Sequence, residues 1–243
     1  HKKTRLPWVA CFNDPYPPEL YPPPYKIERK LNIIEKFTSW LLLDKIYCEP
    51  DALIFPSQRL FAHVDNALRF TDKREKHNYF FIPHIGAGEM INKEPVVKKD
   101  RFIFAHVGKL DKARYSQSFF SAWDKFKGQK KGSVEFRQIG FVDEEVREKL
   151  RKEAIEIIPP VNYEESIKEI DRSNVVVLFE APMEEGIFLP SKFADYISRR
   201  KPVLCLSPKK GVISDLVSNY GGGIVVGPEQ SDQIFDALNL LYD

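Results

Sequence analysis

Basic side chains that could hold a phosphate group follow the strands predicted in the second half of the chain. Gly108 and Lys109 come directly after the first of these strands, and Arg114 follows a few residues later. Lys192 lies in the first turn of a helix expected to open at Pro190, where free N–H groups and the positive end of the helix dipole attract anions. An Arg can grip two phosphate oxygens at once, while a Lys acts as a point charge. The pattern therefore predicts that these three cations converge on one anion, most economically a diphosphate.

Two observations limit this interpretation. Lys and Arg make up 37 of the 243 residues, so some of them must follow strands by chance. The G-x-G-x-x-G fingerprint of a dinucleotide site is absent after the first strand of either half, and the GAG run at 86–88 is more typical of a turn. We therefore expect no dinucleotide cofactor.

The second half of the chain alternates apolar strands with helices. Continuous apolar runs such as Val175–Phe179 indicate strands buried on both faces, as in a parallel sheet. The expected strands are 102–107, 134–138, 154–157, 174–179, 202–206 and 223–226. The expected helices are 116–127, 143–152, 163–170, 191–200, 212–219 and 230–241. This alternation predicts a doubly wound α/β domain, in which ligands bind beyond the carboxyl ends of the strands.

The first half has the same order on a smaller scale. Strands are expected at 7–12, 52–55 and 79–82, with one helix over 26–47 and another from Pro56. This β-α-β-α-β order predicts a second parallel sheet. Residues 83–100 mix Gly, Pro and charges without periodicity, which is typical of an interdomain linker. We expect a partial α/β domain with a linker at 1–95 and a doubly wound α/β domain at 96–243.

Composition argues against several classes of function. A formal net charge of +2, from 37 basic and 35 acidic residues, argues against nucleic-acid binding, which needs a surplus of cations. No apolar run approaches the roughly 20 residues that span a bilayer, and no apolar segment follows the basic start as in a signal peptide. Three Cys without a CxxC pair suit a reducing cytoplasm. Five His without HxH or HExxH spacing predict no zinc site, and His106, inside a strand, is expected to point into the core.

Several stretches resemble, in order, the motifs of bacterial GT-B fold retaining glycosyltransferases of the E-x7-E type, the "glycosyl transferases group 1" family. PWVACFNDPY (7–16) is similar to their PWVADFRDPW strand and loop. DALIFPSQRL (51–60) and FIPHIG (81–86) are similar to their AD-x-I-x-x-S strand and IPNG linker. FAHVGKLDKAR (104–114) resembles H-x-G-x-x-Y-x-x-R, and the stretch from Glu184 to Leu204 resembles PxKLFEYLAAGKPVL. The resemblance covers nearly the whole chain and lies mostly in the C-terminal donor-binding domain.

This resemblance implies a nucleotide-sugar donor in the second domain. Gly108 and Lys109 match the glycine-basic turn that lies against the donor phosphates. Arg114 falls where the motif has a basic residue that serves the diphosphate. Lys192, at the helix start, is expected to join them as a donor-binding residue.

The remaining donor and acceptor positions are implied in the same way. Asp195 matches the second acidic position, which typically binds the ribose hydroxyls through its two acceptor oxygens. Glu185 matches the first acidic position, near the transferred sugar, and Gly186 beside it is placed in the donor site. Tyr163 lies where the nucleobase usually docks. Asp14 ends the first strand and is expected on the acceptor side.

Two features depart from the family motif. Nine residues separate Glu185 from Asp195 where the family has seven, and the second acid is Asp. Glu184 or Glu180 therefore remains an alternative for the first carboxylate.

The implied reaction is transfer of a sugar, with retention at the anomeric carbon, to a saccharide or lipid-linked acceptor in polysaccharide or glycoconjugate assembly. Lys109, Arg114 and Glu185 are expected as its catalytic residues. The two cations would stabilise the departing diphosphate, so neither a metal nor another cofactor is expected. The resemblance places the enzyme in the cytoplasm, with peripheral contact to the inner face of the membrane if the acceptor is lipid-linked.

Two other functions stay open, a nucleotide-sugar 2-epimerase with the GT-B fold and a non-catalytic nucleotide-binding module. Members of the family have two complete doubly wound domains, each of about 150 residues or more. A length of 243 residues therefore suggests a truncated chain that lacks an N-terminal segment. Such a chain is expected to bind the donor weakly and to have no turnover alone.

Overall fold

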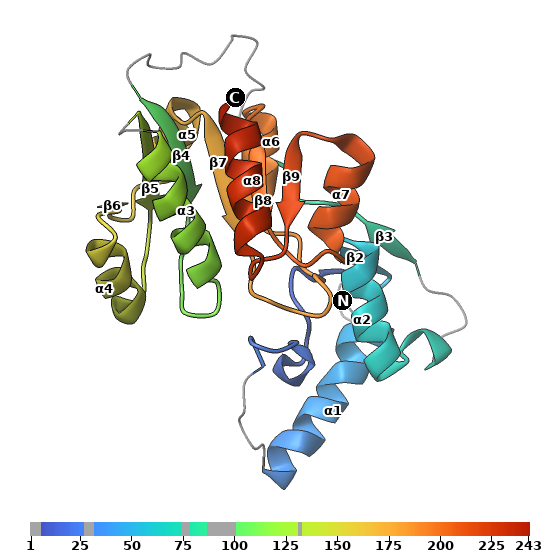
Figure 1. Cartoon of the computed structure of the whole chain (residues 1–243). Coiled ribbons are helices and arrows are strands. Elements are labelled where there is room, and N and C mark those ends of the chain that lie inside the picture. The colour runs from blue at the N-terminus through green and yellow to red at the C-terminus, as the bar shows by residue number, and fades with distance from the viewer. Residues whose placement is uncertain (1–5, 27–31, 74–77, 87–100, 131–132) are drawn as a thin grey trace. The chain divides into compact units, whose positions relative to one another are not determined.

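The computed structural model describes residues 6–26, 32–73, 78–86, 101–130 and 133–243 (Figure 1). The chain divides into two compact units. The N-terminal unit comprises His1–His84 together with Ile187–Leu189, and the C-terminal unit comprises Ile85–Gly186 together with Pro190–Asp243. The domain boundary expected between 95 and 96 lies outside the described residues.

The N-terminal unit contains a parallel sheet with strand order β1-β2-β3. Its elements are β1 (Val9–Cys11), α1 (Ile33–Cys48), β2 (Ala52–Phe55), α2 (Gln58–Leu68) and β3 (Tyr79–Phe81), with 3-10 turns at Pro18–Leu20 and Thr71–Lys73. The β-α-β-α-β prediction is therefore confirmed. The strands are parallel because each helix carries the chain from the end of one strand back to the start of the next.

Helix α1 begins later than the sequence pattern predicts. The Asn32 side chain accepts a hydrogen bond from the backbone N–H of Glu35 (2.8 Å), and the Glu35 carboxylate accepts one from the backbone N–H of Asn32 (2.9 Å). This reciprocal capping box satisfies two free N–H groups and starts the helix at Ile33. Residues 27–31, which the sequence pattern also assigns to the helix, lie outside the described residues.

Apolar residues recur at helical spacing along α1, and most of them are exposed in its N-terminal half. Ile34 and Phe37 are 75% and 60% exposed, and Leu41 and Leu42 are also open to solvent. Tyr47, near the end of the helix, is buried between the rings of Phe12 and Phe70 in the aromatic core of this unit. Helix α1 therefore packs through its C-terminal half.

The C-terminal unit is built on a six-stranded parallel sheet in the order β6-β5-β4-β7-β8-β9. The strands are β4 (Phe102–Val107), β5 (Val134–Ile139), β6 (Glu156–Ile158), β7 (Val175–Phe179), β8 (Val203–Leu206) and β9 (Gly223–Val226). The helices are α3 (Gln117–Gln129), α4 (Glu144–Lys152), α5 (Tyr163–Arg172), α6 (Ser191–Ser198), α7 (Val212–Tyr220) and α8 (Ser231–Tyr242). Each strand and helix expected in this half is present, which confirms the doubly wound prediction. The strand order reverses between β4 and β7, where ligands bind in such sheets.

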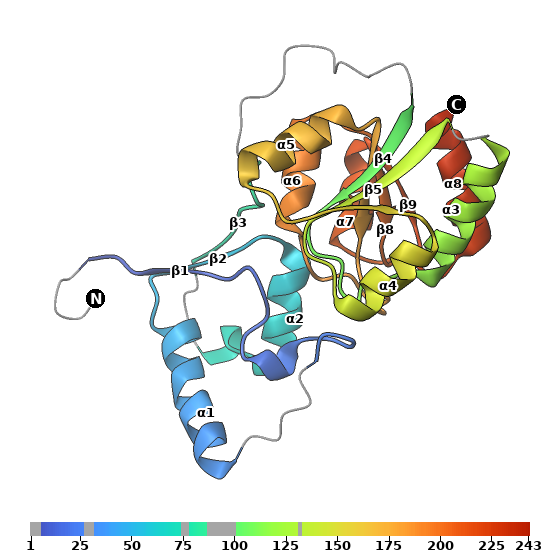
Figure 2. The ribbon, with the colours of Figure 1, turned by 90° about the vertical axis from the view of Figure 1, so that its left-hand side faces the viewer.

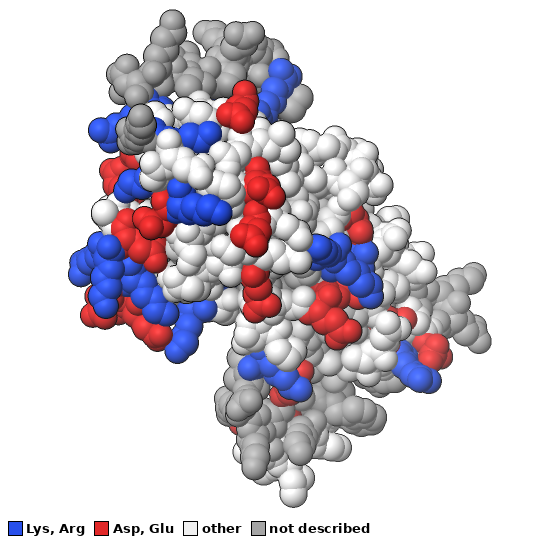
Figure 3. Space-filling view, in the orientation of Figure 1, with Lys and Arg blue, Asp and Glu red and all other residues white. Residues whose placement is uncertain are grey.

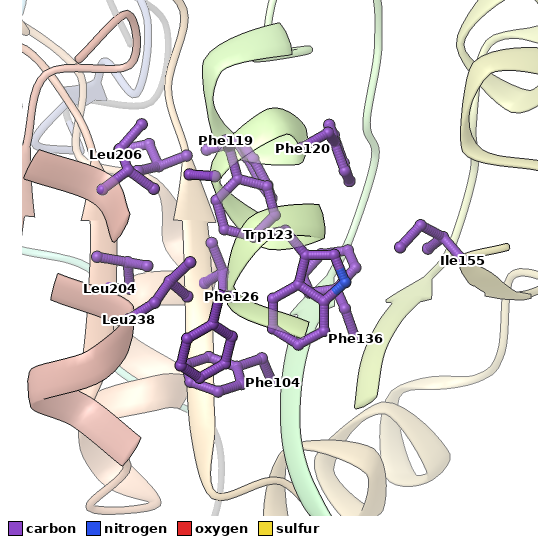
Figure 4. Packing of buried hydrophobic residues seen from close by; sticks show 14 of the residues in the cluster. Phe104, Phe119, Phe120, Trp123, Phe126, Phe136, Ile155, Leu204, Leu206 and Leu238 are labelled. Carbon is purple, nitrogen blue, oxygen red and sulfur yellow. The ribbon is translucent and has the colours of Figure 1, made fainter. Parts of the chain in front are cut away.

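Helices cover both faces of this sheet. Helices α3 and α8 lie on one side and α5 and α6 on the other (Figure 2). On the first side Phe119 and Trp123 of α3 pack against Phe104 and Phe136 of the sheet, with ring centroids 5.2 Å apart for Phe119–Phe136 and 5.5 Å for Phe104–Trp123 (Figure 4). Burial on both faces explains why the central strands are continuous apolar runs.

Charged side chains of both signs are interspersed on the described surface in Figure 3, without one broad basic area. Among the described residues, no helix combines the length and apolar character that crossing a membrane requires.

Two glycine substitutions test whether the backbone at the end of β5 requires a glycine. Gly140 has φ of +121°, and a Cβ there would lie 2.7 Å from the carbonyl oxygen of Gly108. We expect Gly140→Ala to lower the free energy of unfolding by about 2 kcal/mol or more, because it adds backbone strain and a clash. Gly128 of α3 has open space around its Cβ position, so Gly128→Ala should raise stability by up to about 1 kcal/mol. Urea unfolding of both variants measures the difference, and equal midpoints would contradict this account.

Candidate functional site

The turn after β4 brings the backbone of the C-terminal unit close to a side chain from α6. Gly108 has φ of +136°, and its N–H donates to the carbonyl of Ile139 at 2.7 Å. A Cβ at Gly108 would lie only 2.3 Å from Nζ of Lys192. The ammonium group therefore lies directly over Gly108, and a side chain at this position would force the flexible end of Lys192 to move.

Helix α6 carries Lys192 in its first turn and is anchored by Tyr196, one turn further along. The Tyr196 hydroxyl accepts from the N–H of Val107 (3.1 Å) and lies 3.2 Å from the Val107 carbonyl, to which it can donate. Tyr196 is fully buried, so this contact fixes the helix to the end of β4. The structure starts α6 at Ser191 with Pro190 as its N-cap, which confirms the start of the helix expected at 191–200.

The Lys192 ammonium group lies in a cationic environment. Burial, together with the positive charge of Arg114, lowers the pKa of Lys192 to about 8, and the Asp111 carboxylate opposes this shift. Among the described residues, no hydrogen bond or ion pair holds its Nζ. A bound anion would supply the missing partner.

Asp111 organises the other two predicted cations. Its carboxylate accepts from Nη1 of Arg114 at 3.1 Å and lies 3.5 Å from Nζ of Lys109. It also accepts from the backbone N–H of Arg114, which fixes the start of the Arg114 side chain. Lys109 remains half exposed, and its Nζ lies 5.6 Å from the centre of the Phe141 ring.

A pocket of about 370 Å³ opens at these strand ends within the C-terminal unit. Five of the residues predicted for the donor or catalytic site line it, namely Gly108, Lys109, Tyr163, Lys192 and Asp195. Arg114, Glu185 and Gly186 are not among the lining residues. Arg114 affects the pocket because its positive charge lowers the pKa of Lys192.

One wall of the pocket is apolar. It is formed by Ile139, Phe141, Pro160, Val161 and Ile170. Phe141 is 51% exposed and Val161 is 37% exposed, although both are large apolar side chains. Such a wall beside a cationic turn suits a ligand with a flat apolar part and a charged part.

Asp195 and Tyr163, which both line the pocket, form a hydrogen-bonded pair. The Tyr163 hydroxyl donates to Oδ1 of Asp195 at 2.8 Å. Asn162 caps α5 by accepting from the N–H of Glu165 (2.9 Å), which places Tyr163 in the first turn of that helix. One Asp195 oxygen is therefore engaged by Tyr163.

The predicted first acidic position lies on a neighbouring loop. Glu185 is 2.6 Å from Nζ of Lys210. The backbone of Gly186 accepts from Val212 N–H (2.8 Å) and donates to Lys210 O (2.9 Å). A Cβ at Gly211 would lie 2.9 Å from Cα of Gly186, so the loops that follow β7 and β8 cross at two glycines. The loop crossing fixes the backbone beside Glu185.

The alternative carboxylate, Glu180, is buried at the end of β7. It is 4% exposed and accepts from the Ser207 hydroxyl at 2.5 Å. Burial raises the pKa of Glu180 to about 7, against the opposing effects of the Ser207 hydrogen bond and the Arg114 charge. The Glu180 carboxyl group is therefore partly protonated at neutral pH.

The remaining candidates lie apart from the pocket lining. His106 is fully buried, its Nδ1 lies 2.8 Å from the Val177 carbonyl, and burial holds its pKa well below the usual value, which confirms the core position expected from the sequence. Asp14 is exposed after β1 in the N-terminal unit. Among the residues that the structure describes, no three His, Cys, Asp or Glu side chains are grouped to hold a metal ion.

Sequence reasoning missed several residues that shape the pocket. Asp111 and Phe141 follow strands, so the strand-end rule that found Lys109 could have found them. Tyr196 lies one turn after Lys192, on the same helix face, which is a usable signal for a buried partner. Gln138 lies inside a strand, and only the structure shows what it contacts.

Comparison with known proteins defines the fold. No protein-family model and no curated protein matches the chain. Among solved structures, it is similar to Anabaena HepE, solved with UDP and glucose, at a TM-score of 0.66 and 14% identity over 98% of this chain and 62% of HepE. It is similar to WaaG, described as a glycosyltransferase involved in lipopolysaccharide biosynthesis, at 0.66 and 11% identity over 97% of this chain and 66% of WaaG.

A third similar structure is an α,α-trehalose-phosphate synthase (UDP-forming) from Burkholderia vietnamiensis, at a TM-score of 0.61 and 14% identity over 99% of this chain and 60% of that protein. The chain thus spans less than two thirds of the length of each of these proteins. At these identities the similarity establishes the fold, and the chain has the parallel-sheet α/β fold of GT-B glycosyltransferases.

Proposed function

We propose that the pocket of the C-terminal unit binds the nucleotide part of a nucleotide-sugar and that the chain is part of a glycosyltransferase. One observation carries the proposal. The Lys192 ammonium group lies over the bare backbone of Gly108, beside an apolar wall and the Asp195 carboxylate. A diphosphate, a base and a ribose are the chemical groups that match these three surfaces. HepE, which has the same fold, was solved in complex with UDP-glucose.

The diphosphate and the ribose of the donor each have a counterpart in this pocket. Gly108, Lys109 and Lys192 would hold the diphosphate, with Arg114 adding its charge. The free oxygen of Asp195 would accept from a ribose hydroxyl, while Tyr163 holds the other oxygen.

The proposed chemistry is breakage of the bond between the sugar and the diphosphate, with negative charge developing on the departing phosphate oxygen. Cations fixed in advance near that oxygen lower the barrier, and one such donor is worth roughly 3–4 kcal/mol. Lys109 and Arg114 are our candidates for this role. Glu185 is the candidate carboxylate near the transferred sugar, and retention at the anomeric carbon remains our expectation for the reaction.

The acceptor is proposed to be a saccharide or a lipid-linked saccharide, with Asp14 on its side. WaaG is described as acting in lipopolysaccharide biosynthesis, and a comparable role in polysaccharide or glycoconjugate assembly is our proposal for this chain. Nucleotide-sugars are cytoplasmic metabolites. We therefore propose that the reaction takes place in the cytoplasm or at the inner face of the membrane.

Nucleotide binding tests the donor site directly. We expect UDP, GDP or dTDP to bind the chain in calorimetric titrations, and Lys192→Met to weaken that binding roughly 10- to 100-fold because it removes a charged hydrogen-bond donor. Lys152→Met removes an exposed Lys at the end of α4 and serves as the matched control. If no nucleoside diphosphate binds at millimolar concentration, the proposed donor site is wrong.

The lowered pKa of Lys192 gives the binding a pH dependence. The charged ammonium binds the diphosphate, and the bound anion raises its pKa in the complex. Affinity should therefore be near its maximum below about pH 7 and fall as pH rises through the free-protein pKa of about 8. Between pH 7.5 and 9.5 we expect a roughly tenfold loss in the native chain.

The Lys192→Met variant isolates this effect. It has no ammonium group to titrate, so its weak affinity should be constant over the same range. Dissociation constants of both proteins at pH 7.5, 8.5 and 9.5 provide the measurement, and parallel pH profiles would exclude Lys192 as the titrating group.

Sugar transfer is tested with the donor whose nucleotide binds most tightly. When the chain is supplied within a full-length enzyme, we expect release of nucleoside diphosphate that depends on a saccharide acceptor, and a product with the same anomeric configuration as the donor by NMR. Glu185→Gln should reduce this rate at least 100-fold, by analogy with the loss of other fixed electrostatic groups. Release of a free epimerised sugar, with no glycoside formed, would assign an epimerase instead.

A further inference from the structure

Gln138 is a polar residue at a position of β5 where the packing favours an apolar one. It is 0% exposed, and its neighbours Phe136 and Ile139 in the strand are buried apolar residues. Its partner across the sheet is His106 of β4, which is also fully buried. Parallel strands that are buried on both faces are normally apolar throughout, so this amide needs a specific explanation.

The Gln138 amide contacts the turn that follows β4. Its Nε2 donates to the carbonyl oxygen of Gly108 at 2.9 Å. Its Oε1 is buried and has no hydrogen-bond partner among the described residues. Half of the amide is thus engaged with Gly108, while the other half carries the penalty of an unsatisfied polar atom.

The bond to Gly108 sets the direction of the next backbone N–H. The peptide between Gly108 and Lys109 is planar and trans, so the N–H of Lys109 points opposite to the carbonyl of Gly108. Because Gln138 draws that carbonyl inward, the Lys109 N–H turns away from the core. Among the described residues it has no hydrogen-bond acceptor, and both Gly108 and Lys109 line the pocket.

A second buried side chain lies behind the same turn but contacts it weakly. His106 Nε2 is 3.5 Å from the Lys109 carbonyl, whereas its Nδ1 is 2.8 Å from the Val177 carbonyl of β7. The shorter hydrogen-bond contact of His106 is therefore to β7 and not to the turn. Gln138 makes the shorter side-chain contact to the turn.

We propose that Gln138 is a positioning residue for phosphate recognition, which aims the Lys109 N–H at the diphosphate beneath the Lys192 ammonium group. This rests on the proposed donor site. The unsatisfied oxygen of Gln138 is the stability cost of holding one peptide in the orientation that an anion requires. Gln138 does not touch the ligand and acts only through the backbone of Gly108 and Lys109.

Gln138→Met tests this, because Met has a similar shape and cannot donate to the Gly108 carbonyl. UDP, inorganic pyrophosphate and uridine are titrated into the native chain and the variant, with uridine binding followed by ligand-observed NMR. We expect affinity for UDP and pyrophosphate to fall about tenfold. Affinity for uridine should not change, and the unfolding midpoint should stay close to the native value. Gln129→Met, which alters an exposed amide on α3, is the matched control and should leave each affinity unchanged.

The outcomes separate this inference from the proposed function. If the native chain binds neither UDP nor pyrophosphate, the donor site fails and the role of Gln138 fails with it. If the native chain binds UDP and Gln138→Met binds UDP equally well, only the role of Gln138 is overturned. The same conclusion follows if Gln138→Met loses affinity for uridine to the same extent as it loses affinity for UDP.

Gln138→Glu is a second variant in case Gln138→Met does not fold. A protonated carboxyl group can donate to the Gly108 carbonyl, whereas a carboxylate cannot. Its UDP affinity, divided by that of the native chain at the same pH, should therefore recover as the pH is lowered. A ratio that does not change with pH would contradict the proposal.

Discussion

The close approach of the Lys192 ammonium group to the backbone at Gly108 is the constraint on which the pocket depends. A Cβ at this position would lie 2.3 Å from Nζ, so any other residue would push the Lys192 side chain away. Two further contacts maintain the approach. Tyr196 fixes α6 to the end of β4, and Gly140 leaves room for the Gly108 carbonyl. The backbone conformation at Gly108 favours glycine, and the absence of a Cβ lets the Lys192 ammonium group approach the turn.

This packing leaves the positive charges of Lys192 and Arg114 only partly compensated by the protein. Lys192 and Arg114 act on each other as like charges, and Asp111 offsets only part of their repulsion. Glu180, the nearby buried acid, has its pKa raised to about 7 and so supplies little negative charge at neutral pH. Both shifts move the groups toward their neutral forms, as expected when burial outweighs local compensation. An anion placed over Gly108 would reverse this shift for Lys192, which is the electrostatic basis of the proposed diphosphate site.

Much of the fold was predictable from the sequence, and so were many of the pocket residues. Apolar runs located each strand of the C-terminal unit, and the strand-end rule located Gly108, Lys109 and Lys192, which line one pocket. The start of α1 was missed because a capping box, and not the apolar pattern, decides it. The part played by Gln138 was not predictable, since a polar residue within an apolar run has no meaning until its hydrogen-bond partner is known.

The departures from the family motif also become understandable in physical terms. Asp195 is one methylene shorter than the Glu of the motif that this stretch resembles, and its carboxylate stays closer to the helix. Tyr163, from the neighbouring helix α5, reaches that carboxylate with its hydroxyl at 2.8 Å. The Asp195 carboxylate is thus held by a residue from outside its own helix. The loop spacing around Glu185 is in turn set by the glycine crossing at Gly186 and Gly211, which fixes the backbone independently of α6. Glu185 and Asp195 are therefore placed by separate structural elements, so the number of residues between them does not by itself fix the position of either side chain.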